Sequence, residues 1–312
     1  MVDKKKTQAR GGRRGSLLGE DEIAQATSYF QANDLLLNPP IKRAAYSDRT
    51  AWVMASMAQL VYENFEEGGK ARELLLTKLK GGNFELIGEF NDPKTDTQAF
   101  LVTNGDYAVL AFRGTEVTKK MDIKTDAKAF KASVFEGRIH KGFAQAYKSI
   151  EIQILKAIKQ LDDIPLYITG HSLGAAVATV AAQYLERDED IRNQIAACYT
   201  FGSPRVGNRD FDRKLKSSVY RVVNTTDIVT VVPLLAMGYM HIGDVRFLEK
   251  SLAEFRRGIP ITRRIFFFLT AILRLFGPLV GDHAITEYRR KLEAIAQDRN
   301  IELYYDNRSP GR

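Results

Sequence analysis

The pentapeptide Gly170-His171-Ser172-Leu173-Gly174 carries the clearest chemical signal in this sequence of 312 residues. An apolar run at 164–169 precedes it and is typical of a buried strand, and small residues at 175–182 follow it and are typical of a packed helix. Strand, G-x-S-x-G and helix in this order predict a nucleophile elbow, a turn so sharp that only small residues fit two positions before and after the serine. We therefore predict that the Ser172 hydroxyl is exposed as a nucleophile and that the backbone N–H of Leu173 faces a developing oxyanion. Gly170 and Gly174 are the elbow glycines of this prediction.

A serine hydroxyl becomes a good nucleophile only when a base takes its proton, and an acid must hold that base in one tautomer. The sequence has four histidines. His140 precedes the serine, and His171, inside the pentapeptide, is expected to point into the sheet. In folds with this elbow the acid and then the histidine follow the serine along the chain. His241 and His283 therefore remain as candidate bases.

Asp227 is the leading candidate acid, because it comes directly after a predicted strand at 219–224. The carboxyl ends of parallel strands lie at one edge of a sheet and gather catalytic groups there. We therefore expect Asp227 and Ser172 at the same edge. His283 lies in a turn at 281–283 that opens the last predicted helix, far enough downstream to return to that edge.

The elements that must position these residues change their period along the chain. Early runs with a period of two predict strands joined by tight turns, and strands then alternate with helices. This order predicts the α/β class, with a single, mostly parallel mixed sheet and helices on both faces. We expect one domain at 19–304, between a disordered basic segment at 1–18 and a flexible tail at 305–312. The predicted strands are 84–90, 97–102, 107–112, 164–169, 195–201, 219–223 and 244–248, and the predicted last helix is 283–296.

Seven ordered segments resemble the fungal-type class 3 triacylglycerol lipases, a family of α/β-hydrolases that includes bacterial members. The resemblance covers roughly residues 45–295, and seven ordered motifs are far more specific than the elbow alone. The matching segments are 96–100, 109–115, 140–143, 170–176, 199–208, 221–229 and 282–283.

The resemblance implies a catalytic triad and an oxyanion hole. It assigns Ser172 as the nucleophile, Asp227 as the orienting acid and His283 as the general base. Thr115 matches the second oxyanion-hole position, beside the backbone N–H of Leu173. The remaining polar candidates are interpreted as bystanders or structural residues: Asp210, Asp212, Asp282, His140 and His241.

The chain departs from the family pattern at two places. Asp122 is followed by Ile123, whereas the family usually has tryptophan there, in its lid region. This change bears on how the lid closes. The elbow continues as Gly174-Ala175-Ala176 where a second glycine is usual, and because alanine is small, helix–strand packing should survive.

Charge and cysteine content bear on the compartment. The net charge is +8, with basic residues gathered at 1–15 and among apolar residues at 256–274. Basic and apolar groups together favour an anionic membrane surface over nucleic acid. A lone cysteine, Cys198, excludes an internal disulfide and fits a reduced compartment. The N-terminal residues lack an apolar stretch, so we expect no secretory signal. A cytoplasmic protein with peripheral membrane contact is the expectation, and export without a signal peptide stays open.

Two segments are expected to contact lipid. A lid at about 116–135 combines a modest apolar face with several lysines, and an apolar insert at about 255–280 lies between the acid and the base. The insert is interpreted either as an interfacial element or as a buried helix pair that covers the sheet. Its longest apolar run, 265–280, is 16 residues long and contains Arg274. This run is too short and too charged for a confident membrane span.

The sequence therefore predicts a lipase or carboxylesterase that hydrolyses triacylglycerol-like lipid esters through an acyl-enzyme. The expected partners are the lipid ester and a membrane or lipid-droplet surface, with no metal, organic cofactor, nucleic acid or obligate protein partner. A phospholipase A1, a galactolipase or an acyltransferase using the same serine are alternatives among enzymes. A catalytically silent, membrane-associating binding protein with the same fold is the alternative from another class.

Overall fold

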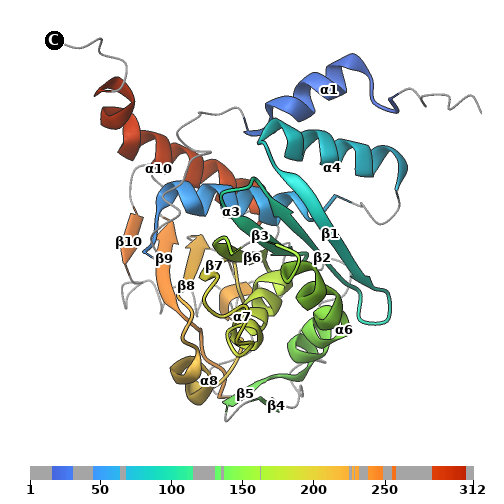
Figure 1. The fold of residues 1–312 in the computed structure, drawn as a ribbon. Helices are drawn as coiled ribbons and strands as arrows, with labels where there is room; N and C mark the ends of the chain where they lie inside the picture. Colours follow the sequence, from blue (N-terminus) through green and yellow to red (C-terminus); the bar gives the residue numbers. More distant parts are fainter. Residues whose placement is uncertain are drawn as a thin grey trace, which may run out of the picture.

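A mixed sheet of eight strands runs through the centre of the protein, in the order β1-β2-β3-β6-β7-β8-β9-β10 (Figure 1). The five central strands, β3, β6, β7, β8 and β9, are parallel to one another. Strands β1 and β2 at one edge and β10 at the other are added as antiparallel pairs. The computed structural model describes residues 16–30, 45–63, 68–114, 131–134, 137–161, 163–224, 227, 229–231, 238–248, 255–257 and 283–306. The strands are β1 Glu85–Asp92, β2 Thr97–Thr103, β3 Ala108–Phe112, β6 Leu166–His171, β7 Ile195–Phe201, β8 Val219–Asn224, β9 Asp244–Leu248 and β10 Phe255–Arg257.

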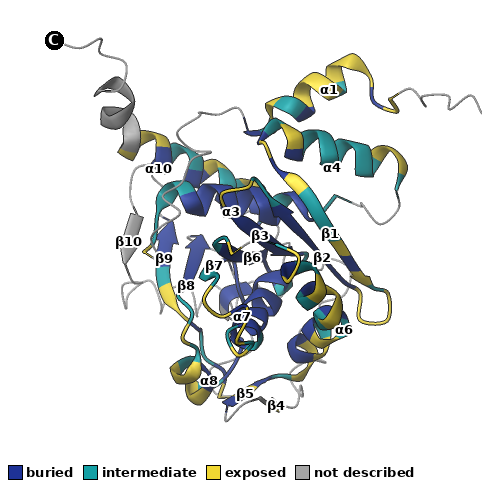
Figure 2. Cartoon of the chain, in the orientation of Figure 1, coloured by how far each residue is buried: buried dark blue, intermediate teal, exposed yellow. Residues whose placement is uncertain are grey.

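Helices cover both faces of this sheet, as the sequence predicts. One face packs mainly against α3 and α10, and the other packs against α6 and α7. In Figure 2 the sheet and the helices that lie on it are mostly buried, whereas α1 and α8 expose much of their surface. The helices are α1 Glu20–Thr27, α3 Asp48–Leu60, α4 Gly69–Gly81, α6 Lys141–Ile158, α7 Leu173–Leu185, α8 Arg209–Lys214 and α10 Ile285–Asp306, with short 3-10 turns η1 Ser28–Phe30 and η4 Val229–Val231.

The period of two in the strands explains how the two layers form. Along β3, Val109 and Ala111 enter one hydrophobic cluster, whereas Leu110 enters the other. Successive side chains of a strand point to opposite faces, so a buried central strand must be apolar at every position. In β3 all five residues are buried. This burial accounts for the continuous apolar runs in the sequence.

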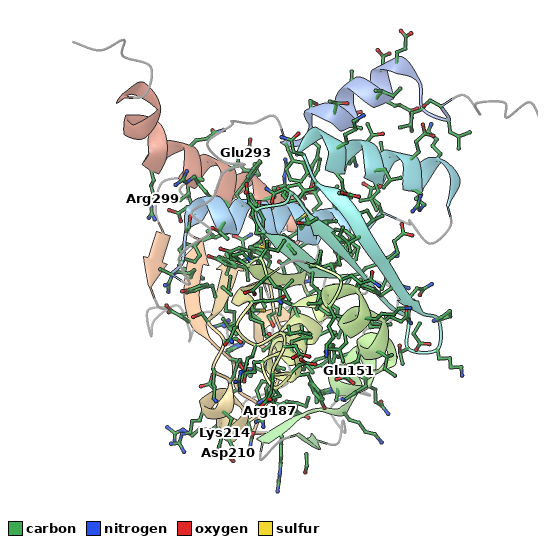
Figure 3. All side chains as sticks on the ribbon, viewed as in Figure 1. Glu151, Arg187, Asp210, Lys214, Glu293 and Arg299 are labelled. Carbon is green, nitrogen blue, oxygen red and sulfur yellow. The ribbon has the colours of Figure 1, made fainter. Side chains whose placement is uncertain are left out.

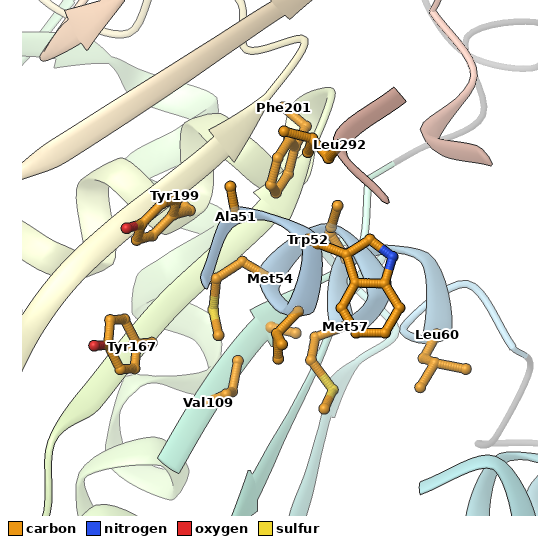
Figure 4. Packing of buried hydrophobic residues seen from close by; sticks show 14 of the residues in the cluster. Ala51, Trp52, Met54, Met57, Leu60, Val109, Tyr167, Tyr199, Phe201 and Leu292 are labelled. Atoms are coloured by element: carbon orange, nitrogen blue, oxygen red, sulfur yellow. The ribbon is translucent and has the colours of Figure 1, made fainter. Parts of the chain in front are cut away.

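Helix α3 is the centre of the first cluster. The side chain of Ser47 caps the helix by accepting a hydrogen bond from the backbone N–H of Thr50, as the sequence around 47–50 predicts. Trp52 and Met54 are fully buried. Met54 lies near Val109, Tyr167 and Tyr199 (Figure 4), whereas the Trp52 ring lies edge-on to Phe30 with the centroids 6.2 Å apart. Truncating such an aromatic side chain to alanine costs about 3–5 kcal/mol.

Helix α10 is fixed on α3 by polar contacts as well as by apolar packing. Arg289 donates from Nε to Ser56 Oγ at 2.9 Å and from Nη2 to the carbonyl of Tyr29 at 2.6 Å. Arg299 pairs with Asp48 at 2.9 Å, near the exposed end of the helix in Figure 3. The orientation of α10 is therefore set from several points, which matters because this helix carries part of the site.

The structure differs from the sequence predictions at a few elements. A separate hairpin, β4 Lys131–Val134 paired with β5 Gly137–His140, was not predicted, and β4 falls at the end of the predicted lid. Strand β10 occupies the start of the predicted insert. The last helix extends to Asp306 rather than ending at residue 296. Most of the lid and the rest of the insert lie outside the described residues. Among those that are described, no helix is long and apolar enough to cross a bilayer.

Candidate active site

Ser172 lies on a strained turn between β6 and α7. Its backbone has φ 58° and ψ −126°, in the left-handed region that non-glycine residues rarely adopt. The two flanking glycines make this turn sterically possible. A Cβ atom at Gly170 would collide with the backbone of Gly174, and one at Gly174 would collide with the backbone carbonyl of Phe112. The predicted strand, turn and helix of a nucleophile elbow are therefore present.

The Ser172 side chain is buried, whereas the sequence analysis expected it to be exposed. The residue is 1% exposed. The turn after β3 packs directly against it, because a Cβ atom at Gly114 would lie 3.3 Å from Ser172 Cβ. Access to the hydroxyl is therefore set by the segments around the elbow as well as by the elbow itself.

Asp227 and His283 form the acid–base pair that the sequence analysis expected. His283 Nδ1 lies 2.9 Å from Asp227 Oδ2, and the two residues are 7% and 4% exposed. Asp227 Oδ1 accepts the backbone N–H of Val229 at 2.9 Å, which anchors the carboxylate on η4. A carboxylate oxygen accepts the hydrogen bond at this contact, and Nδ1 of His283 donates it. Nε2 is the other ring nitrogen, and it is the atom that would act as a general base.

The two atoms that would exchange a proton are both unpartnered. Ser172 Oγ and His283 Nε2 are buried and have no hydrogen-bond partner among the described residues. The structure thus forms the His283–Asp227 bond and leaves the bond between serine and histidine open. Such catalytic bonds are often long in unliganded structures and tighten when substrate binds. Burying a polar atom without a partner is costly, so a substrate that supplied partners to these two atoms would offset that cost.

The oxyanion hole is described in part. Leu173 is the first residue of α7, so its backbone N–H has no partner within the helix and adds to the positive end of the helix dipole. Its place next to Ser172 fits the predicted donor. Thr115, the second predicted donor, lies outside the described residues, one position beyond Gly114.

His171 supports the loop of the candidate base, rather than simply pointing into the sheet as expected. Its Nε2 lies 2.6 Å from the backbone carbonyl of His283, and its Nδ1 lies 2.9 Å from the hydroxyl of Tyr62. A carbonyl only accepts, so Nε2 carries the proton and the Tyr62 hydroxyl donates to Nδ1. Burial, and next the charge of His283, hold the pKa of His171 well below its ordinary value. His171 is therefore neutral and positions the His283 backbone.

Tyr288 is a site residue that the sequence analysis missed. The helical pattern of 283–296 places it on the apolar face of the last helix, with Ile285, Leu292 and Ile295. In the structure its hydroxyl donates to Asp227 Oδ2 at 2.5 Å. Burial, and next the charge of Asp227, raise the pKa of Tyr288 well above its usual value, so the hydroxyl stays protonated. The hydroxyl of a buried tyrosine usually has a polar partner. A tyrosine on the apolar face of the helix that follows a candidate base is therefore the sequence signal that could have identified Tyr288.

The other histidines and acids were interpreted as structural residues or bystanders, and the structure describes all of them except Asp282. His140 caps α6 by accepting the backbone N–H of Gly142 at 3.2 Å. Asp210 lies on α8 with Lys214, at the lower end of the molecule in Figure 3. Asp212 Oδ1 accepts the backbone N–H of Gly243. His241 lies just before β9 and Asp282 falls outside the described residues. Within the described part of the chain, no group of three or more metal-ligating side chains is found.

Residues 109–237, which contain the elbow, match the model of the family described as Lipase (class 3). This part of the chain is similar to class 3 lipases. The chain is 31% identical over 167 residues to the secreted mono- and diacylglycerol lipase A of Penicillium cyclopium, which covers 49% of this chain and 53% of that protein. It is 38% identical over 108 residues to the chloroplastic phospholipase A(1) DAD1 of Arabidopsis thaliana, covering 30% and 24%. The chain therefore spans about half the length, or less, of these curated relatives.

The fold has a counterpart among solved structures. The crystal structure of a lipase from Rhizopus microsporus var. chinensis superposes with a TM-score of 0.52 at 24% identity, covering 75% of this chain and 76% of that one. This likeness confirms the α/β-hydrolase fold that the sequence predicts. The roles of individual residues rest on the geometry described above.

Proposed function

We propose that this protein is a serine ester hydrolase that acts on lipid acyl esters through an acyl-enzyme on Ser172. The observation that carries the proposal is the buried hydrogen bond between His283 Nδ1 and Asp227, which leaves Nε2 as the ring nitrogen available to act as a base. Ser172 Oγ, on its strained turn, likewise has no hydrogen-bond partner among the described residues. The match of residues 109–237 to the class 3 lipase family supports lipid esters as the substrate class. The intact set of nucleophile, base and acid argues against a catalytically silent binding protein.

The chemistry follows from the proton positions. Ser172 Oγ attacks the ester carbonyl while His283 Nε2 takes the hydroxyl proton, and Asp227 stabilises the imidazolium that forms. The carbonyl oxygen becomes an oxyanion facing the backbone N–H of Leu173, with Thr115 as the proposed second donor. Collapse breaks the bond to the alcohol, which leaves with the proton from His283. Water then adds to the acyl-enzyme by the same route and releases the fatty acid and Ser172.

The glycerolipid class of the substrate is part of the proposal. The similarity to relatives named as mono- and diacylglycerol lipases supports neutral acylglycerols as the substrates of this chain. The similarity to relatives named as phospholipases A1 supports a second candidate function, the removal of an acyl chain from a membrane phospholipid. Both reactions use the same triad and differ in the head group that the site accepts. A panel of triacylglycerol, diacylglycerol, phospholipid and galactolipid separates these candidates.

Contact with a lipid surface is proposed as well. The net charge of +8 and the basic residues at 1–15 and 256–274 favour an anionic surface. The lid at 116–135 and the insert at 255–280 would supply apolar area next to the serine. We expect stronger binding to anionic than to neutral vesicles, weakened by salt because charges are screened within about 10 Å at 0.1 M. Equal binding to both vesicle types would contradict this surface contact.

The compartment is a proposal with evidence on both sides. Cys198 is buried and unpaired, which fits a reduced compartment, whereas several relatives are named as secreted lipases. A cytoplasmic protein that binds membranes peripherally is proposed. Cell fractionation tests it, and recovery of the protein mainly from the medium would overturn it.

Substitution of the nucleophile tests the proposed reaction. Ser172→Ala should lower the hydrolysis of a p-nitrophenyl acyl ester by about 10⁴-fold or more, because the covalent route is removed. Ser149→Ala is a matched control, since this serine lies on α6 and bonds Thr95 and the carbonyl of Ala146. Unchanged hydrolysis by Ser172→Ala would overturn the proposal. A folded wild type that hydrolyses no ester and forms no adduct with a fluorophosphonate would instead favour the silent binding protein.

A further inference from the structure

One oxygen of the candidate acid receives two hydrogen bonds. Asp227 Oδ2 lies 2.9 Å from His283 Nδ1 and 2.5 Å from the hydroxyl of Tyr288. Tyr288 is fully buried, and its ring lies edge-on to Phe201 with the centroids 6.1 Å apart. The catalytic scheme above uses the bond from His283 and assigns no role to the bond from Tyr288.

The direction of the Tyr288 hydrogen bond follows from its second partner. The backbone N–H of Asn224 lies 3.0 Å from the Tyr288 hydroxyl oxygen. A backbone N–H only donates, so the phenol oxygen accepts from Asn224 and its own proton goes to Asp227. The hydroxyl therefore bridges the last residue of β8 and the carboxylate three residues later.

A second side chain of α10 fixes the same end of β8. Lys291, one helical turn after Tyr288, is 5% exposed, and its Nζ lies 2.5 Å from Asn224 Oδ1. Residues three positions apart lie on one face of a helix. Tyr288 and Lys291 thus hold the end of β8 from one face of α10, and the first of them contacts the acid itself.

We propose that Tyr288 is a positioning residue that holds the Asp227 carboxylate and sets the basicity of His283. The proposal rests on the proposed function, since it concerns the base of that reaction. Two donors on one oxygen share its negative charge, so the carboxylate attracts the imidazolium less than it would with Oδ2 bonded to His283 alone. Tyr288 therefore keeps His283 neutral, and active as a base, at a lower pH than the pair would allow without it.

The charged and titratable groups around His283 come from three sides. Asp227 follows β8, His171 ends β6, and Tyr288 lies on α10. Arg221 of β8 also acts electrostatically on Tyr288. Tyr288→Phe removes the hydroxyl and retains the ring against Phe201, so it isolates the hydrogen bond from the packing.

The test compares Tyr288→Phe with the wild type on a soluble short-chain ester. We expect kcat to fall about 10- to 100-fold with KM within about twofold, because a hydrogen bond to a charged group near the reacting atoms is lost. The acid limb of the pH profile of kcat/KM should move to higher pH. A packing role would lower the melting temperature and leave both the acid limb and kcat unchanged, and that result would overturn the proposal.

Tyr147→Phe is the matched control. Tyr147 is also fully buried, lies on α6 on the other side of the sheet, and its hydroxyl has no hydrogen-bond partner among the described residues. This variant should keep the kcat and the acid limb of the wild type.

Two further measurements keep the proposal testable if Tyr288→Phe does not fold or the wild type hydrolyses no ester. Site-specific 3-fluorotyrosine at position 288 retains the side chain and makes its hydroxyl a stronger donor, so the pKa of His283 should move down. Imidazole nitrogen NMR measures that pKa without any turnover. A wild type that is inactive refutes the proposed function alone, whereas a His283 pKa that ignores the fluorine refutes the role of Tyr288.

Discussion

The nucleophile and the base of this site are held in place by different forces. Ser172 is held by steric fit, because Gly170 and Gly174 let three backbone segments approach so closely that no side chain fits between them. His283 is held by hydrogen bonds, through its ring to Asp227 and through its carbonyl to His171. The first arrangement is local in sequence. The second joins residues that are 56 and 112 positions apart.

This difference predicts two kinds of failure. A single added methyl group at an elbow glycine should abolish the steric fit, because the methyl group must displace backbone. Loss of one hydrogen bond to His283 should reduce activity only in part, because the other bonds still hold the residue.

Gly174→Ala should be the most damaging substitution. Its Cβ atom would overlap the carbonyl of Phe112 and the backbone of Arg113, so the elbow cannot form without moving β3. We expect the free energy of unfolding to fall by about 3 kcal/mol or more, with loss of fluorophosphonate labelling. Chemical denaturation and labelling measure both. Gly19→Ala is the control, because the atom nearest to its added Cβ atom, a Glu22 carboxylate oxygen, would lie 3.8 Å away. A Gly174→Ala protein with wild-type stability and labelling would contradict the steric account.

Asp227→Asn should retain the fold and lose most of the activity. The amide no longer stabilises the imidazolium and favours the wrong tautomer of His283, which lowers kcat by about 10⁴-fold in comparable triads. Steady-state kinetics on a soluble ester measures the change. Asp212→Asn, on α8, is the control and should leave kcat unchanged. If Asp282→Asn proves more damaging than Asp227→Asn, the assignment of the acid is wrong.

His171→Asn should give a graded loss. It removes the contact with the carbonyl of His283 and the partner of Tyr62, but leaves the His283–Asp227 bond intact. We expect kcat to fall about 10- to 100-fold, and Tyr62→Phe, which loses one bond further away, to fall less. Kinetics of the two variants measures this order. A loss of kcat as large as that of Asp227→Asn would contradict the expectation that losing one hydrogen bond to His283 reduces activity only in part.

The stability of the folded state should depend on pH through His171. Burial holds the pKa of His171 well below its ordinary value, so the histidine binds a proton near pH 6.5 in the unfolded chain but not in the folded chain. The contribution of His171 to the free energy of unfolding is therefore largest above that pH and decreases as the pH falls. Between pH 7.5 and 5.5 this group should remove about 1.4 kcal/mol of unfolding free energy. Urea denaturation at the two pH values measures it, and the wild type and His171→Asn should differ by this amount. Identical pH dependence in the two proteins would refute this contribution.

The sequence predicts the local half of this comparison well. The period of two fixes the buried strands, and the glycines around Ser172 fix the elbow, because both depend on neighbouring residues. Asp227 and His283 are also brought together as expected. The bond from Tyr288 and the support from His171 were not predicted, because they depend on the placement of α10 and α3 against the sheet. A helical pattern shows which face is apolar, but it does not show which residue meets a polar group.

Helix α10 contributes both core contacts and the hydrogen bond to the acid, and this gives the protein an order of assembly during synthesis. Strands β3, β6, β7 and β8 and the elbow precede α10 along the chain, so the nucleophile and the acid leave the ribosome before the base. Until residues 283–306 emerge and dock on α3, Asp227 lacks both His283 and Tyr288. The proposed ester hydrolase site is therefore incomplete in the nascent chain, and it is completed only when α10 docks on α3.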